Sequence, residues 1–412
     1  MKIVFFLQFI PDPCGAFFHD IILARALQMR GHQVHLVTVA KKFPQRGVYR
    51  GLPFSFFEVS GKEIESADIL NTAHYPCLQF VRKLNEKYEK PLLITMHYGE
   101  DTFHIENCQR AGKWAEFLWF VSPNIEKKVL STIKIAPSFV DTHLVRPTFI
   151  ESDVALYRKG EKPRGDCITL INANILKGVE VFVEIAKRCP DRKFLAVKPY
   201  YNIVKVPENI PNIEWIDVQD DIKEVLKRTR ILLVPSAYES WGRVAFEAMY
   251  NGIPVIYTKP ADNFPGFNFK SGTTQGMKEW IGDAAIECDR TKVDEWVDAI
   301  QRLDDESIYM DYSDRGHDCT EQMHIFDEIP DIEKHMFEYA VKYAPAQKQK
   351  GVVEVSQQPN YRLGMNRITS THLHRFAPGN LAVPQQQPQT QPQQVRMPSA
   401  LGLPGGRFGM RR

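Results

Sequence analysis

Short apolar runs alternate with segments of helical period along most of this 412-residue chain. Strands that are apolar on both faces, and that are separated by amphipathic helices, indicate a parallel sheet covered by helices on both sides. We therefore expect a doubly wound α/β domain over residues 1–150. The runs with strand character are KIVFFLQF, QVHLVTV, ADILNTA, PLLITMH and AEFLWFVS, and the helical segments between them include HDIILARALQMR and FVRKLNEKY.

The same alternation begins again after a polar stretch. Residues 151–166, ESDVALYRKGEKPRGD, carry charges, Gly and Pro with little periodicity, which predicts a linker. A second α/β domain is then predicted over residues 167–329, and a chain of this length is long enough for two domains. Its strands are CITLINAN, KFLAVKP, RILLVPS and IPVIYT, and its helices are GVEVFVEIAKRC, DDIKEVLKRT and VAFEAMYNG.

The end of the chain has a different character. Apolar residues at three-to-four spacing predict one last helix over residues 330–345. Residues 346–412 are rich in Gln, Pro, Gly and Arg, and we expect them to be disordered because they cannot bury enough apolar surface. This tail carries 9 Lys and Arg against 1 Glu, whereas the whole chain carries 52 basic and 50 acidic residues. A basic tail of this kind is predicted to contact an anionic surface.

Cysteine usage and hydropathy bear on the compartment. The 7 cysteines are scattered singly with no C-x-x-C pair, which suggests neither a disulfide framework nor a zinc site and favours a reducing cytoplasm. The apolar start of the chain is interrupted by Gln8 and ended by Pro11, so we interpret it as a buried strand. No run of about 18 apolar residues occurs. We expect a cytoplasmic protein, peripheral at most to a membrane or to nucleic acid.

The most informative segment is LLVPSAYESWGRVAFEAM at residues 232–249. A strand is predicted to end at Ser236, a loop carries Glu239, and a helix begins near Gly242 with Glu247 inside it. Ligands bind at the carboxyl ends of strands in open α/β sheets, and helix N-termini there attract phosphate. Two carboxylates at this edge could hold a nucleotide sugar from both ends. The alternative is that Glu239 caps the helix and Glu247 is a solvated helix residue.

This segment resembles the Glu-x7-Glu motif of the retaining glycosyltransferases of the GT-B fold, in the family called glycosyl transferases group one (CAZy family four-like). The string E-S-W-G-R-V-A-F-E-A-M and the following G-I-P-V-I carry the resemblance. Weaker similarity occurs in the same order at residues 31–34, 94–97, 136–141, 171–179 and 276–280, so the resemblance covers residues 3–340. It implies two Rossmann-like domains facing each other across a cleft, with the acceptor on the N-terminal domain and the nucleotide-sugar donor on the C-terminal domain.

The resemblance also implies roles for individual residues. Glu247 would accept hydrogen bonds from the donor ribose, Glu239 would meet the donor sugar near the reacting carbon, and Lys177 would neutralise the diphosphate. His97 would lie against the sugar from the N-terminal domain, although a histidine alone is more often a packing residue. Glu239 and His97 are the candidate catalytic residues. Gly15 would let the backbone approach the diphosphate. Further donor contacts would come from the amides of Ser240, Trp241, Gly242, Arg243 and Val244.

The implied reaction separates charge, because breaking a sugar–phosphate bond leaves positive charge on the ring and negative charge on the diphosphate. The family stabilises this leaving group with basic side chains and amides and without a metal, and the sequence contains no Asp-x-Asp. The resemblance therefore implies a retaining, metal-independent hexosyltransferase that uses a nucleotide-diphosphate sugar as co-substrate and has no tightly bound cofactor. The acceptor could be a glycan, a lipid, a small molecule or a nucleic acid.

Two positions depart from the family pattern. The family usually has Arg five residues before the lysine, where this chain has Asn172, and we hypothesise that Lys198 or Arg243 supplies the missing charge at the phosphates. Gly15 stands where two adjacent glycines are common, which predicts a tighter donor pocket. Three alternatives stay open: a nucleotide-sugar epimerase of the same fold, a non-catalytic nucleotide-sugar binding protein, and a glycosyltransferase whose acceptor is a nucleic acid held by the tail.

Overall fold

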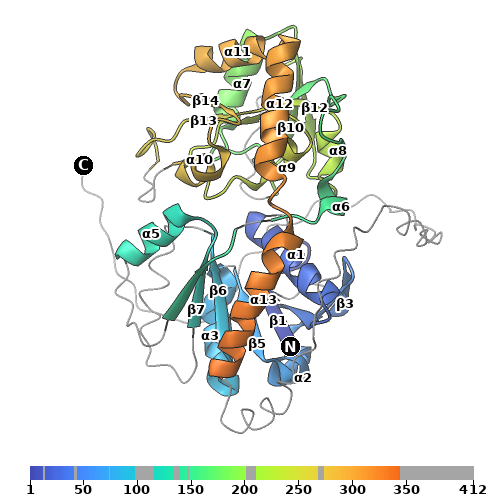
Figure 1. Cartoon of the computed structure of the whole chain (residues 1–412), viewed down its shortest axis with the longest axis vertical. Coiled ribbons are helices and arrows are strands. Elements are labelled where there is room, and N and C mark those ends of the chain that lie inside the picture. The colour runs from blue at the N-terminus through green and yellow to red at the C-terminus, as the bar shows by residue number, and fades with distance from the viewer. Residues whose placement is uncertain are drawn as a thin grey trace, which may run out of the picture. The chain divides into compact units, whose positions relative to one another are not determined.

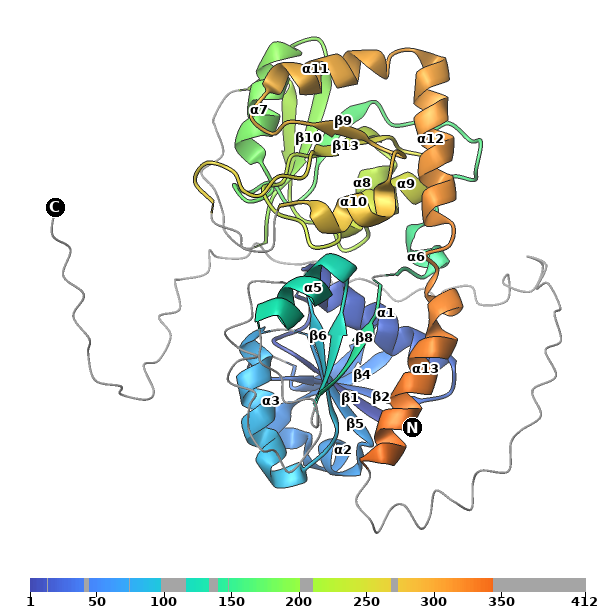
Figure 2. The same ribbon diagram turned by 60° about the vertical axis from the view of Figure 1, so that its left-hand side comes forward.

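The computed structural model describes residues 1–12, 14–40, 44–73, 75–97, 116–132, 140–146, 148–200, 210–267 and 273–343. The predicted disordered tail at residues 346–412 lies outside these ranges, as do residues 136–139 of one segment that carries the family resemblance. Within them the chain forms two largely parallel sheets, each with helices on both faces (Figures 1 and 2). The predicted α/β class with two Rossmann-like domains is confirmed.

The N-terminal sheet has eight strands in the order β3-β4-β2-β1-β5-β6-β7-β8. All neighbours pair in parallel except the β3–β4 hairpin, which is antiparallel. The sequence analysis did not predict this hairpin or β8. The strands are β1 (Lys2–Leu7), β2 (Gln33–Thr38), β3 (Arg46–Tyr49), β4 (Leu52–Phe56), β5 (Ile69–Thr72), β6 (Leu92–Met96), β7 (Glu116–Phe120) and β8 (Val140–Leu144).

Strand β1 shows why this sheet needs helices on both faces. Ile3 and Phe5 point into one apolar core, and Val4 and Phe6 point into another, because successive side chains of a strand alternate between faces. The first core is covered by α1 (Gly15–Met29), and the second by α2 (Gly61–Ser66), α3 (Tyr75–Tyr88) and α5 (Pro123–Thr132). A short 3-10 helix, η1 (Phe57–Val59), follows β4.

The C-terminal sheet has six parallel strands in the order β11-β10-β9-β12-β13-β14. They are β9 (Cys167–Leu170), β10 (Lys193–Val197), β11 (Ile213–Ile216), β12 (Thr229–Val234), β13 (Val255–Thr258) and β14 (Ile286–Cys288). The helices are α7 (Val179–Arg188), α8 (Lys223–Leu226), α9 (Arg243–Tyr250), α10 (Gln275–Ile281), α11 (Val293–Arg302) and α12 (Glu306–Thr320). Among the described residues that connect the two sheets, the one helix is the short α6 (Glu151–Val154).

Two predicted helices differ in extent. DDIKEVLKRT forms only the four-residue α8, because Thr229 already belongs to β12 and its hydroxyl donates to the carbonyl of Val225. The helix expected at residues 330–345 is α13 (Ile325–Lys342), with Pro330 inside it. Ile325 and Ile329 extend the helix on its N-terminal side because both are buried in the core that also contains Ile3 and Phe5 of β1.

Helix α13 therefore packs on the N-terminal sheet although it follows the C-terminal sheet in the sequence. Figure 1 shows it in orange across the blue and teal elements near the N-terminus. Its buried residues share their core with α1, and the ring of Tyr339 stacks on Phe117 of β7 at 3.8 Å between centroids. Within the part of the chain that the structure describes, no helix is long and apolar enough to cross a bilayer.

Candidate functional site

A cavity of about 790 Å³ is lined by residues that follow strands of both sheets. This is where a doubly wound sheet binds ligands, because its loops converge at the carboxyl ends of the strands. All twelve site residues predicted from the sequence line this one cavity, although they are spread over more than half of the chain. They are Gly15, His97, Asn172, Lys177, Lys198, Glu239, Ser240, Trp241, Gly242, Arg243, Val244 and Glu247.

The loop before α9 is built to present backbone N–H groups. Gly242 is the N-cap of α9 with φ of 78°, and a Cβ atom there would lie 2.5 Å from Sδ of Met277. Only glycine fits this left-handed, crowded position. Among the described residues, none accepts a hydrogen bond from the amides of Ser240, Trp241 or Gly242. Free amides at a helix N-terminus form a ready site for an anion.

Glu239 and Lys177 meet at the centre of the site. Nζ of Lys177 lies 2.5 Å from Oε1 of Glu239, and the hydroxyl of Ser236 donates to the same oxygen at 2.7 Å. The carboxylate of Glu239 is buried, and the backbone N–H of Glu239 donates to the carbonyl of Thr273. The helix cap is Gly242, with no side chain capping it, so the alternative role of Glu239 as a cap is wrong.

Glu247 lies one turn inside α9 and is also buried. Its Oε1 is 2.7 Å from the guanidinium of Arg243, which lies beside the rings of Phe18 and Phe246. Burial raises the pKa of Glu247 above its ordinary value, with the charge of Arg243 opposing the shift. The alternative in which Glu247 is a solvated helix residue is therefore wrong.

The turn after β9 brings Lys177 to the cavity. Asn172 has φ of 63°, a left-handed conformation that Asn tolerates better than most residues, and its Oδ1 accepts a hydrogen bond from Nδ2 of Asn174 at 3.0 Å. This geometry gives a local reason for Asn where the family usually has Arg. Gly178, at φ of 81°, packs so closely that a Cβ would lie 2.1 Å from the carbonyl oxygen of Pro235.

Lys198 and the N-terminal residues complete the lining. Nζ of Lys198 lies 2.9 Å from Oδ1 of Asp217. Gly15 is the first residue of α1, and a Cβ there would meet nothing within 4 Å. Burial raises the pKa of the adjacent Cys14 thiol to about 12, which makes it a poor nucleophile. His97 follows β6, and its ring lies edge-on to the ring of His19 at 4.9 Å.

Residues 198–306 match the family model of the glycosyl transferases group 1. Over these residues the chain is similar to the group 1 glycosyltransferases. The matched residues include Glu239 and Glu247, the second of which lies in α9, whereas Lys177, His97 and Gly15 lie outside them. Among curated proteins, none matches this sequence significantly.

Solved structures match over both sheets. Sucrose-phosphate synthase from Thermosynechococcus elongatus is 13% identical with a TM-score of 0.63, over 82% of this chain and 100% of that one. HepE from Anabaena in complex with UDP-glucose is 12% identical with a TM-score of 0.64, over 82% and 100%. The catalytic domain of starch synthase IV from Arabidopsis thaliana, bound to ADP and acarbose, is 12% identical with a TM-score of 0.57, over 82% and 99%. The GT-B fold predicted from the sequence is confirmed.

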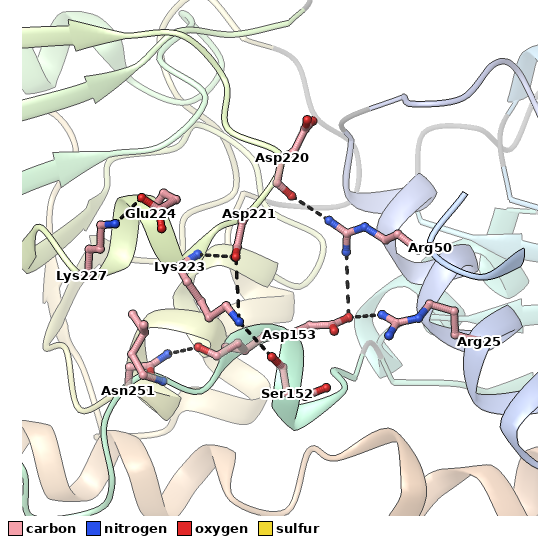
Figure 3. Close-up of polar contacts among 12 residues, drawn as sticks. Arg25, Arg50, Ser152, Asp153, Asp220, Asp221, Lys223, Glu224, Lys227 and Asn251 are labelled. Carbon is pink, nitrogen blue, oxygen red and sulfur yellow. Dashed lines mark hydrogen bonds and ion pairs between the residues drawn. The ribbon is translucent and has the colours of Figure 1, made fainter. Parts of the chain in front are cut away.

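Sequence reasoning missed a group of charged residues on the wall of the cavity, where elements of the N-terminal and C-terminal sheets meet (Figure 3). Arg25 of α1 pairs with the carboxylate of Asp153 in α6, and Arg50 lies 3.9 Å from the same carboxylate. Arg50 also donates to the backbone carbonyl of Asp220 at 2.7 Å, and Lys223 donates to the carbonyl of Ser152 at 3.0 Å. No motif marks these residues, because each belongs to a different element and only the tertiary fold brings them together.

The lining of this cavity is rich in charges of both signs. Its cations are Arg25, Arg50, Lys177, Lys198, Lys223 and Arg243, and its anions are Asp153, Asp220, Asp221, Glu239 and Glu247. Lys177, Lys198 and Arg243 are each paired with a carboxylate. An anionic ligand would therefore bind by drawing a cation partly away from its acidic partner, and the freed carboxylate could then accept hydrogen bonds from hydroxyl groups of the same ligand.

Proposed function

We propose that this protein transfers a sugar from a nucleotide-diphosphate sugar to an acceptor, with retention of anomeric configuration, in the cavity described above. The observation that carries the proposal is the convergence of both motif glutamates, Lys177 and the free amides before α9 on one cavity. The match to the group 1 family over residues 198–306 supports the same activity. Fold neighbours bound to UDP-glucose and to ADP support a nucleotide-linked donor.

The donor is proposed to bind with its two ends at the two acidic side chains. Glu247 would accept hydrogen bonds from the ribose, and Glu239 would accept them from hydroxyls of the sugar. Lys177 and the amides of residues 240–242 would surround the diphosphate between them, close to α9. Arg243 and Lys198 are candidates for the charge that Asn172 does not supply. Each could turn toward the phosphates from its present carboxylate partner.

The chemical step needs stabilisation of the departing diphosphate more than it needs a nucleophile on the protein. Lys177 and preorganised N–H groups meet negative charge as it develops, which is an effective form of transition-state stabilisation in a partly buried site. With these cations and amides supplied by the chain, the proposed mechanism requires no metal. Glu239 is held by Lys177 and Ser236, so we assign it to sugar binding rather than to covalent attack.

The acceptor is proposed to bind on the side of the N-terminal domain, near His97 and Gly15. Its class is not fixed by the residues of the cavity, and a glycan, a lipid, a small molecule and a nucleic acid all stay candidates. The 9 basic residues of the tail favour an anionic surface or acceptor as its partner. Deleting residues 346–412 should then lower turnover of long polyanionic acceptors and leave that of small acceptors unchanged.

The experiment that tests the function has two stages. Thermal stabilisation by a panel of nucleotide sugars identifies the donor, because a ligand held by the folded state raises the melting temperature. Transfer to a panel of acceptors is then followed, and the anomeric configuration of the product is read by NMR. Wild-type protein should give product with retained configuration, and Glu247→Ala should not bind donor. Epimerised sugar from donor alone, or tight donor binding without transfer to any acceptor, would contradict the proposal.

A further inference from the structure

Three side chains of types that can ligate a metal come together outside the cavity, between β8 and α13. His143 lies on β8, the edge strand of the N-terminal sheet, and Asp331 and His335 lie one turn apart on α13. One ligand atom from each of the three lies within 4.8 Å of the others. No described residue of α13 lines the cavity, so this cluster is separate from the proposed donor site.

The distances in the cluster are close to those of a metal coordination shell. Nε2 of His143 lies 3.4 Å from Oδ2 of Asp331, and one ligand atom of His335 lies within 4.8 Å of both. A tetrahedral zinc ion with bonds of about 2.0–2.2 Å separates neighbouring ligand atoms by about 3.4 Å. The ligand atoms of His143 and Asp331 are therefore at the spacing that zinc requires.

Nδ1 of His335 already makes a hydrogen bond of the kind that holds the ring of a metal-bound histidine. Nδ1 lies 2.9 Å from the backbone carbonyl of Asp331, and since a carbonyl only accepts, Nδ1 carries the proton. This leaves the lone pair on Nε2 of His335 for a metal. A metal-bound histidine commonly donates its other N–H to a carbonyl or carboxylate, which fixes the tautomer and the ring. The ring of His335 also packs against that of His143 at 3.8 Å between centroids.

The donor set selects the kind of ion. Two imidazoles with one carboxylate suit Zn²⁺ and similar transition metals, whereas Ca²⁺ and Mg²⁺ prefer oxygen ligands alone. His143, Asp331 and His335 are 17%, 61% and 27% exposed, so an ion can enter from solvent and keep a water as its fourth ligand. The second cluster with such residues, His317, Asp318 and Glu321, is a weaker candidate because the His317 ring is buried and stacked on Tyr250.

We propose that His143, Asp331 and His335 bind Zn²⁺ and that the ion fastens α13 to the edge of the N-terminal sheet. Helix α13 already meets the sheet beside β8, where Tyr339 stacks on Phe117 of the neighbouring strand β7. An ion bound by β8 and α13 together binds only when the helix is docked, so binding adds to the stability of that docking. The site does not depend on the proposed glycosyl transfer, because none of its residues lines the cavity.

The test uses the full chain, stripped of metal with a chelator and titrated with Zn²⁺ in competition with a chelating dye. Wild-type protein should bind Zn²⁺ and show a higher melting temperature with it. Asp331→Asn and His335→Ala should lower the Zn²⁺ affinity at least about 10- to 100-fold and abolish the thermal shift. Asp331 is exposed, so its amide variant should fold. Glu321→Gln, which removes a carboxylate from the weaker cluster, is the matched control and should bind like wild type.

Cobalt gives an independent readout, because Co²⁺ in a tetrahedral nitrogen and oxygen site has visible absorption that the hydrated ion lacks. This absorption should appear with wild-type protein and with Glu321→Gln, and it should disappear with Asp331→Asn. Zn²⁺ affinity that is unchanged in both Asp331→Asn and His335→Ala would overturn the proposal. A wild-type melting temperature that does not respond to Zn²⁺ would overturn it as well.

Discussion

Nζ of Lys177 and Oε1 of Glu239 lie 2.5 Å apart, although the two residues follow different strands of the C-terminal sheet. The pair is partly shielded, since Lys177 is 25% exposed and Glu239 is 8% exposed. A lysine held by a carboxylate at the place where the diphosphate is proposed to bind can exchange one anionic partner for another. The two residues are therefore expected to affect donor binding together.

Replacing Lys177 by Met should weaken binding of the nucleotide diphosphate. A hydrogen bond to a charged group is worth about 1.5–3 kcal/mol, which corresponds to about 10- to 150-fold in affinity. Calorimetry with the donor nucleotide measures this change in affinity. Lys187→Met is the control, because Lys187 is exposed on α7 and pairs only with Glu184 among the described residues. Equal affinities for wild type and Lys177→Met would show that Lys177 does not contribute to binding of the diphosphate.

Gly15, which lines the cavity, and Gly178, which follows the lining residue Lys177, should respond to alanine in opposite ways. Gly15→Ala should leave stability near that of wild type, because its Cβ meets nothing within 4 Å, but should weaken donor binding by about 1–3 kcal/mol if backbone and diphosphate touch there. Gly178→Ala should lower the free energy of unfolding by more than about 1–2 kcal/mol, since φ is 81° and the Cβ would meet Pro235. Urea unfolding and donor titration on both variants separate the effects. Normal donor affinity in a folded Gly15→Ala variant would exclude the close approach.

Sequence patterns predicted the central strands well because burial on both faces leaves a continuous apolar signature. They missed β3 and β8 at the edges of the N-terminal sheet and β11 and β14 at the edges of the C-terminal sheet, where the pattern is weaker, and they also missed β4, the partner of β3. They also gave no sign that α13 returns to the N-terminal sheet. Its apolar stripe shows that one face is buried, but the partner of that face depends on how the chain returns to the N-terminal sheet at residues 321–324, between α12 and α13.

The residues of the site were likewise predicted in part and missed in part. Glu239, Glu247 and Lys177 were found because local motifs carry them, and the structure places them on one cavity. Arg25 and Arg50 were missed because their importance arises from contacts with Asp153 and Asp220, which no spacing in the sequence reveals. The His143 cluster joins a strand and a helix that are distant in the chain, so it too has no motif.

Glu247 should make stability depend on pH. Its pKa is raised by burial above the ordinary value of 4.5, so the folded state holds this proton more tightly than the unfolded state. Its contribution to the free energy of unfolding is therefore fully present below pH 4.5 and is lost as pH rises through the folded pKa. The Glu247→Gln variant has no carboxyl group to titrate at this position and does not lose this contribution. The free energy of unfolding of the variant, relative to that of wild type, should therefore increase with pH. Urea unfolding at several pH values tests this, and a difference that stays constant or shrinks would contradict the raised pKa.

Arg50 should contribute more to ligand binding than to stability. It is 29% exposed, and partly exposed ion pairs add only about 0.2–1 kcal/mol to stability. Its positive charge on the cavity wall is expected to add about 1 kcal/mol to binding of an anionic donor, or about fivefold in affinity. Arg46→Ala is the matched control, since Arg46 is on the same hairpin, pairs with Glu63 and does not line the cavity. Equal donor affinity in Arg50→Ala and Arg46→Ala would show that Arg50 does not act on the donor.

Helix α13 should be required for the stability of the N-terminal domain although it lies at the far end of the sequence. Met336 is fully buried in the core that contains Phe5, whereas the next residue, Phe337, is 53% exposed. Met336→Ala should cost about 2–5 kcal/mol of unfolding free energy, because it removes buried apolar atoms and leaves a cavity. Phe337→Ala removes more atoms but should cost less than about 1 kcal/mol. Chemical unfolding of both variants measures the two losses of unfolding free energy. Equal costs would mean that α13 does not pack through the face containing Met336, and that the helix is not a part of the N-terminal core.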